Sequence, residues 1–239
     1  MRNNYIRIGT LFLLLFSFNI SQAQIYVNTN VVGGLNDGSS WSNAYAELSV
    51  ALQNTNSSQQ LWVAQGIYYP TSGTNRNISF QLPQDVAIYG GFIGNETSLG
   101  QRDWTNNITI LSGDIGATGV VTDNSLVIVN IAQTTTMATL DGFTIQHGYA
   151  DGLYLKSGAG LFVNSYATNT GSNPIIENCT FTKNYSEGNG GAVYVEAAAG
   201  GLASPTFTNC FFHDNESGFS GGAVSVSYTH LTLPTICSV

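Results

Sequence analysis

The stretch from Pro174 to Val195, PIIENCTFTKNYSEGNGGAVYV, is followed by a second copy of the same unit, PTFTNCFFHDNESGFSGGAVSV, from Pro205 to Val226. The two prolines stand 31 residues apart, and the cysteines, the asparagines and the GGA triplets keep the same interval. A fixed period of this size, with strand-like content and no helical pattern, is typical of a solenoid in which each unit stacks on the previous one. The repeat therefore predicts an architecture and says nothing yet about chemistry.

A third unit, ATLDGFTIQHG at 138–148, aligns with both copies and indicates which positions face the interior. Three columns stay apolar and should point inward: Leu140, Ile176 and Phe207; Phe143, Cys179 and Cys210; Ile145, Phe181 and Phe212. The GGA segments add two more, Leu161, Val193 and Val224 with Val163, Val195 and Val226, whereas Phe162, Tyr194 and Ser225 form a variable face. The uniform face is expected inside and the variable face outside.

Two other columns hold only glycine and asparagine, namely Gly142, Asn178 and Asn209, and Gly148, Asn184 and Asn215. Both residue types tolerate the left-handed backbone, so each column predicts a sharp bend in every coil. Stacked asparagines can also hydrogen-bond along a column. Short strands, sharp bends and no helix between them predict an all-β fold, a parallel β-helix whose strands pair between successive coils.

Helical periodicity occurs once, from Asn43 to about Thr55, with Ser42 or Asn43 as the N-cap. Its apolar face consists of Trp41, Ala44, Leu48, Ala51 and Leu52. A helix before the first strong strand is expected to cap the open end of the solenoid. Strands are expected at 25–27, 61–64, 78–82, 86–92, 108–111, 126–131 and 140–145.

No break in composition divides the chain after its leader, which predicts one domain. A strand and the capping helix would occupy 24–60, and the coils 61–226. The tail at 227–239 departs from the repeat, which indicates an artefactual or truncated end.

Residues 1–23 have the pattern of a secretory signal peptide. Arg2 and Arg7 precede the apolar run from Leu11 to Phe18, and a small-residue cleavage site ends at Ala23. The apolar run is too short for a permanent span, so no transmembrane helix is expected in the mature chain. The segment predicts secretion.

Charged residues make up only 8% of the chain, and its formal net charge is −8. Removing the leader would leave four basic residues, Arg76, Arg102, Lys156 and Lys183, against all 14 acidic ones. This balance argues against nucleic acid, anionic lipid and strongly anionic glycans as partners.

The three cysteines, Cys179, Cys210 and Cys237, are too few and odd in number for a disulfide framework. Cys179 and Cys210 are expected to stack either as two thiols or as a disulfide between coils.

The segments NCTFTKN and GNGGAVYV together resemble the repeat of bacterial polymorphic outer-membrane proteins, which carries FxxN and GGA-plus-aliphatic segments. The first half looks like the leading region of secreted β-helix proteins of Bacteroidetes-type bacteria, through NDGSSW (36–41), LWVAQGIYYP (61–70), YGGFIGNET (89–97), QRDW (101–104) and ILSGD (110–114). This resemblance, to the pectin-lyase-like superfamily, implies a right-handed β-helix and a protein that is secreted or held at the outer-membrane surface of a Gram-negative bacterium. It implies no single activity, because that superfamily holds lyase-like enzymes, adhesins and autotransported passengers alike.

Several polar groups were weighed as catalytic or metal sites. A lyase would need Ca²⁺-binding carboxylates and an arginine or lysine base. Arg102 beside Asp103 indicates a loop salt bridge or turn, and Lys183 with His147 and Asp214 indicates a solvated patch. The arginine- and proline-rich signature of pectate lyases is absent.

A hydrolase would need two facing carboxylates. Asp141 and Glu177 should stack one coil apart at a bend, where acids are commonly just solvated. The polygalacturonase signatures are absent.

Asp37 and Asp114 could each meet Ca²⁺ in a turn but lack a calcium-loop spacing, and His147, His213 and His230 lack metal-ligand spacing. No catalytic or metal-ligating residue and no cofactor is therefore predicted, with Ca²⁺ the one ion left open, and the ligand-binding residues stay unknown.

Two functions remain. The first is a non-catalytic, adhesin-like protein that binds an extracellular glycan or a cell-surface component. The alternative is a polysaccharide lyase or glycoside hydrolase whose groove lies partly in coils beyond this chain.

Overall fold

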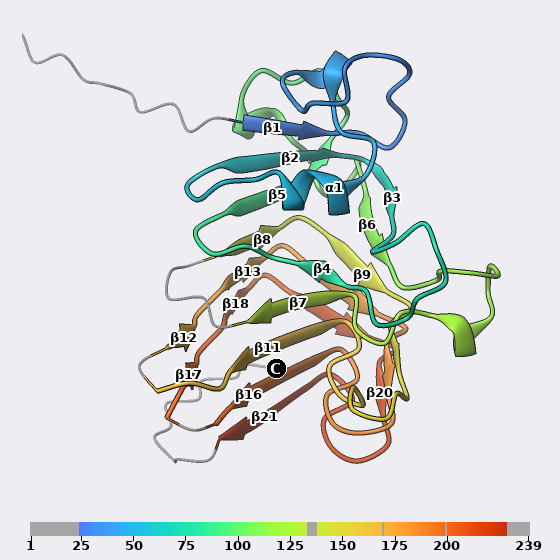
Figure 1. The fold of residues 1–239 in the computed structure, drawn as a ribbon, viewed down its shortest axis with the longest axis vertical. Coiled ribbons are helices and arrows are strands. Elements are labelled where there is room, and N and C mark those ends of the chain that lie inside the picture. Colours follow the sequence, from blue (N-terminus) through green and yellow to red (C-terminus); the bar gives the residue numbers. More distant parts are fainter. Residues whose placement is uncertain (1–23, 133–137, 169, 199, 229–239) are drawn as a thin grey trace, which may run out of the picture.

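The computed structural model describes residues 24–132, 138–168, 170–198 and 200–228 (Figure 1). The predicted signal peptide, Cys237 and all of the tail from residue 229 lie outside the described residues. Within them the chain forms a stack of coils with β1 at one end and β21 at the other (Figure 1).

Three long parallel sheets run along the stack, here called sheets A, B and C. Sheet A contains β1 (Gln24–Val27), β2 (Gln60–Ala64), β5 (Ala87–Phe92), β8 (Thr139–Asp141), β13 (Ile175–Glu177) and β18 (Thr206–Thr208). Sheet B contains β3 (Gly66–Tyr68), β6 (Thr109–Ser112), β9 (Thr144–Gln146), β14 (Thr180–Thr182) and β19 (Phe211–His213). Sheet C contains β4 (Phe80–Gln81), β7 (Val129–Ala132), β11 (Leu161–Ser165), β16 (Val193–Ala197) and β21 (Val224–Tyr228).

Two short sheets join them in the later coils. One holds β10 (Tyr149–Ala150), β15 (Tyr185–Ser186) and β20 (Glu216–Ser217), and the other holds β12 (Gly171–Ser172) and β17 (Leu202–Ala203). Each coil passes from sheet A to sheet B and then to sheet C, and each strand pairs in parallel with its counterpart in the next coil. The protein is an all-β, right-handed parallel β-helix, which confirms the predicted fold class.

The predicted inward columns match the observed register. Ile176 pairs with Leu140 and Phe207, and Phe181 pairs with Ile145 and Phe212. Val193 pairs with Leu161 and Val224 in sheet C. All these side chains belong to or pack against one hydrophobic core, so the period of 31 residues sets one coil of a continuous interior.

The first predicted bend is confirmed, because Gly142, Asn178 and Asn209 have positive φ angles of 84°, 51° and 51°. The second prediction is wrong by one residue. The left-handed positions are His147, Lys183 and Asp214, with φ angles of 66°, 56° and 55°, and not the glycine and asparagines that follow them.

The asparagine after the second bend has a different role, which explains the shift. Asn184 is 1% exposed and points inside, where its amide donates to the Ile145 carbonyl and accepts from the Gly148 N–H, both at 3.0 Å. It also donates to Asn215 Oδ1 at 3.0 Å. The column is therefore a buried amide ladder, and the polar residue before it turns the backbone outside.

The predicted helix at 43–55 is shorter than expected. A 3₁₀ turn η1 (Trp41–Asn43) with Ser40 as N-cap precedes the α-helix α1 (Leu48–Gln53). Between them Ala44 is extended and Tyr45 makes a parallel bridge to Val27, so pairing with β1 interrupts the helix.

The helix still meets the predicted core. Leu48, Ala51 and Leu52 are buried, and α1 contacts β1 and β4, so it lies over the first strand of sheet C. Two further 3₁₀ turns, η2 (Leu99–Gln101) and η3 (Val121–Asp123), lie in the longer loops. Among the described residues, no helix has the length and hydropathy needed to cross a bilayer.

Candidate functional site: a groove at the corner of sheets A and B

A cavity of about 340 Å³ lies outside the bend that joins sheets A and B. Its floor comes from that bend and from the outward face of sheet B, where Thr144, Thr180 and Phe211 stand in register. Its other wall is the loop before β6, which contributes Trp104 and Ile108. We call this the corner groove, and its residues used below are Trp104, Thr144, Asn178, Thr180, Asn209 and Phe211.

The loop that carries Trp104 is fastened onto strand β5. Asp103 donates its backbone N–H to the Gly91 carbonyl at 2.7 Å, and the Asn107 amide donates to the same oxygen at 3.2 Å. A Cβ on Gly91, whose φ is 92°, would lie 2.7 Å from the Trp104 backbone. Glycine is needed here because the loop approaches the strand too closely for any side chain.

Arg102 extends from this loop across the outer face of sheet A. Its guanidinium forms an ion pair with Asp141 and also donates to the carbonyls of Gly90 and Asp141, each at 3.3 Å. The guanidinium carbon lies 5.0 Å from the ring centre of Tyr89 and 4.7 Å from that of Trp104. The two charged side chains are only 8% and 5% exposed, so they neutralise each other away from water.

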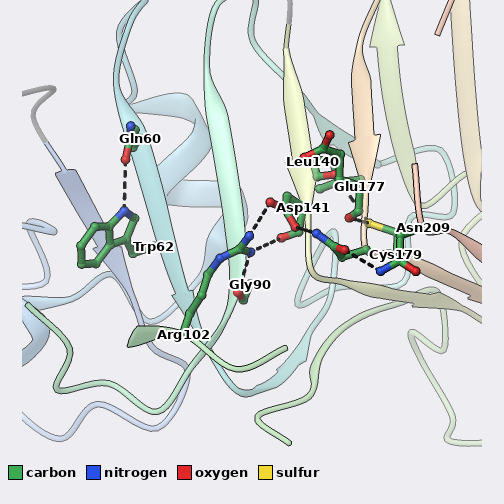
Figure 2. A network of polar contacts seen from close by, with 10 residues as sticks. Gln60, Trp62, Gly90, Arg102, Leu140, Asp141, Glu177, Cys179 and Asn209 are labelled. Atoms are coloured by element: carbon green, nitrogen blue, oxygen red, sulfur yellow. Dashed lines mark hydrogen bonds and ion pairs between the residues drawn. The ribbon is translucent and has the colours of Figure 1, made fainter. Parts of the chain in front are cut away.

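A chain of amides continues from this ion pair into the corner groove (Figure 2). Asn178 Nδ2 donates to Asp141 Oδ1 at 2.7 Å, and Asn209 Nδ2 donates to Asn178 Oδ1 at 2.7 Å. The predicted asparagine ladder is thus present at the first bend as well as at the second. It links the loop of the early coils to the outermost described coil.

The structure places Asp141 and Glu177 side by side, as the sequence predicts, since they pair between β8 and β13. Both Asp141 carboxylate oxygens are occupied, one by Arg102 and the other by Asn178. Burial, followed by the charge of Asp141, raises the pKa of the neighbouring Tyr89. Asp141 therefore acts as the centre of a structural network.

Asp103 is not the partner of Arg102, although the two are adjacent in sequence. Its carboxylate accepts hydrogen bonds from Thr105 and Asn106, which hold its pKa at about 2. The prediction of a salt bridge in this loop is correct in kind, but the acid comes from the coil below.

The second group of candidates also stacks as predicted. His147, Lys183 and Asp214 occupy successive positions of the second bend, and His213 Nδ1 lies 2.9 Å from Asp214 Oδ2. Burial lowers the pKa of His147. His230 lies outside the described residues.

The two acids considered for Ca²⁺ each cap a turn. Asp37 Oδ1 accepts the Ser39 N–H at 2.9 Å, and Asp114 Oδ1 accepts the Gly119 N–H at 2.9 Å. Within the described ranges, no three His, Cys, Asp or Glu side chains are grouped so as to hold a metal ion.

Cys179 and Cys210 are free thiols in successive coils. Cys179 is buried, which raises the pKa of its thiol, and its hydrogen bond with Cys210 lowers the pKa of the Cys210 thiol. The first of the two alternatives, a stacked pair of thiols, is the one in the structure.

Sequence reasoning did not identify the corner groove. The register of Thr144, Thr180 and Phe211 could have been read from the alignment, because these residues alternate with the inward columns. Trp104 could not, because its position depends on how an irregular loop folds back over a strand.

A family model described as "Right handed beta helix region" matches residues 125–233. No curated protein matches the chain, and no solved structure matches it either. The matched segment covers the most regular coils. Family model and coordinates agree that this chain is a right-handed parallel β-helix protein.

Proposed function

We propose that this protein is secreted or displayed at the bacterial surface and binds a glycan in the corner groove without cleaving it. The observation that carries the proposal is the composition of the groove. Two aromatic side chains, Trp104 and Phe211, flank the amides of Asn178 and Asn209 and the hydroxyls of Thr144 and Thr180.

Such a surface suits sugars for a physical reason. The faces of aromatic rings offer apolar area to the C–H faces of a pyranose, and fixed amides and hydroxyls satisfy its hydroxyl groups. Phe211 is 63% exposed and Trp104 is half-buried, so both rings are within reach of a ligand.

The cellular location rests on the leader at 1–23 and on the resemblance to outer-membrane repeat proteins and Bacteroidetes-type secreted β-helices. The charge balance supports a neutral rather than a polyanionic partner. The groove lining contains no lysine or arginine, and the guanidinium of Arg102 behind it is already paired.

A glycan array tests the proposal with the full chain and with Trp104→Ala and Phe211→Ala. Both substitutions should abolish or strongly weaken binding while leaving the circular dichroism spectrum unchanged. Tyr154→Ala is the matched control, because Tyr154 is 91% exposed and lies outside the groove lining. Binding that survives both groove substitutions, or no binding by the wild-type chain, overturns the proposal.

The enzymatic alternative is favoured by one observation, the position of Glu177 next to Asp141 and directly before the groove residue Asn178. A hydrolase or lyase would use Glu177, since Asp141 is held by Arg102 and Asn178. Incubating the protein and Glu177→Gln with neutral and uronate polysaccharides plus Ca²⁺ tests this. New reducing or unsaturated ends, lost with Glu177→Gln, would establish the alternative, and their absence across the panel would reject it.

A further inference from the structure

We propose that Asp141 is a positioning residue that fixes the direction of the Asn178–Asn209 amide ladder, so that the corner groove presents a hydrogen-bond acceptor and selects sugars bearing hydroxyl or ammonium donors over uronates. This inference rests on the glycan-binding function proposed above. It names the class of ligand that the same site takes.

The direction of the ladder follows from the first pair. An arginine can only donate hydrogen bonds and an ionised carboxylate can only accept them. Arg102 donates to one Asp141 oxygen, and the other oxygen can be satisfied only by a donor. Asn178 must therefore turn its NH₂ group toward Asp141, as it does at 2.7 Å (Figure 2).

The same constraint passes to the next coil. With its NH₂ group committed, Asn178 offers its carbonyl oxygen, and Asn209 donates its own NH₂ group to that oxygen at 2.7 Å. Asn209 is left with Oδ1 at the end of the ladder. Among the described residues no donor is bonded to this atom, and the Asn209 side chain is exposed in the groove.

The acceptor at the end of the ladder favours one class of ligand. A hydroxyl or an ammonium group can donate to Asn209 Oδ1, whereas the carboxylate of a uronate can only place one acceptor against another. Arg102, the guanidinium behind the groove, is paired with Asp141 and gives a uronate no compensating charge.

Substituting Asp141→Asn tests the directional argument because it should reverse the ladder. Arg102 can still only donate, so the new amide must turn its oxygen toward Arg102 and its NH₂ group toward Asn178. Asn178 and Asn209 then rotate in turn, and Asn209 Nδ2 replaces Oδ1 in the groove. The neutral side chain also leaves the Arg102 charge unpaired, so the variant is compared only after its fold has been checked by circular dichroism.

The readout is the ratio of affinities for two oligosaccharides of equal length, a neutral or amino-sugar oligomer and a uronate oligomer, measured by calorimetry. We expect the wild type to favour the donor-bearing oligomer by about tenfold, the effect of one hydrogen bond to a charged group, and Asp141→Asn to favour the uronate. A merely structural role for Asp141 would lower both affinities and leave their ratio unchanged.

A second variant keeps the inference testable if Asp141→Asn does not fold. Asn209→Leu removes the exposed acceptor and should remove the preference, whereas Asn173→Leu, at an exposed asparagine outside the groove, should keep it. Wild-type binding with an unchanged ratio in Asn209→Leu overturns the inference and leaves glycan binding intact. No binding of either oligomer by the wild type overturns both.

Discussion

The early coils and the late coils share one interior but differ in their outer faces. From residue 138 onward, equivalent side chains stand in register, so aromatic rings and amides stack in open columns, such as Phe162 on Tyr194 at 5.7 Å. Before residue 132, long loops fold back over sheet A and cover it. Trp62 is 1% exposed there and stacks on Phe92 at 4.8 Å.

This difference shows where a solenoid acquires a specific site. Regular repeats produce identical surfaces in every coil, and such a surface has no unique position. The corner groove forms where the last irregular loop meets the first regular coils, with Trp104 on one side and Asn178 on the other. Breaking either region should therefore have distinct consequences.

The largest effect is expected from the core of the regular coils. Phe181 is fully buried and stacks on Phe212 at 5.0 Å, so Phe181→Ala should lower the free energy of unfolding by about 3–5 kcal/mol. Urea denaturation followed by circular dichroism measures this loss. Phe211→Ala, one residue away but facing outward, should change it by no more than about 0.5 kcal/mol. Equal losses would contradict the inward and outward assignment.

The link between the two regions should be nearly as sensitive. Arg102→Ala leaves the buried Asp141 without its cation, which should cost about 3 kcal/mol and release the loop that carries Trp104. Lys156→Ala is the control, because its ion pair with Glu187 is nearly half-exposed and should contribute less than about 1 kcal/mol. Thermal unfolding of both variants decides the comparison, and a loss for Arg102→Ala no larger than for the control would show that the ion pair does not join the regions.

A smaller loss should come from the bend where the loop touches the coils. Gly142 has a φ of 84°, and a Cβ there would lie 3.0 Å from both Arg102 Nη1 and Trp104 Cβ. Gly142→Ala should therefore cost about 1–3 kcal/mol through strain and contact together. Gly119→Ala isolates the strain, because Gly119 has a φ of 78° and open space around it. Identical losses in urea would mean that the close approach of the loop adds nothing.

The smallest effect concerns acid sensitivity of the loop. The hydrogen bonds of Thr105 and Asn106 hold the pKa of Asp103 at about 2, below its unfolded value of about 3.9. Because the folded pKa is the lower one, the stabilising contribution is present above about pH 4 and is lost as the pH falls toward 2. Asp103→Asn should therefore flatten the decline of the melting temperature in this window. A decline as steep as in the wild type would show that the carboxylate has no such role.

Much of the fold can be predicted from the repeat because register follows directly from a fixed period. Ile176, Phe181 and Val193 lie inside as expected, since moving one of them outside would shift a whole strand. The second bend was misplaced by one residue because asparagine has two uses in a coil. It can adopt the left-handed backbone, as Asn178 does, or it can satisfy buried backbone groups from inside, as Asn184 does.

The candidate site was less predictable for a related reason. Asp141 and Glu177 were correctly stacked, yet the sequence alone suggested that a bend leaves such acids solvated. The cation that buries Asp141 comes from Arg102, 39 residues earlier, and the adjacent Asp103 in the sequence was the obvious partner instead. Only the path of the loop shows which acid the arginine reaches.

The sequence by itself determined the parallel β-helix, its inward columns and its glycine and asparagine bends, because these depend on short-range backbone preferences repeated at a fixed interval. The tertiary structure decided where the outer face is covered and where it is open. Loop conformations have no period, and the partners of Arg102 and Trp104 are set by packing between coils. The groove, and the amide ladder that ends in it, exist only once those coils are stacked.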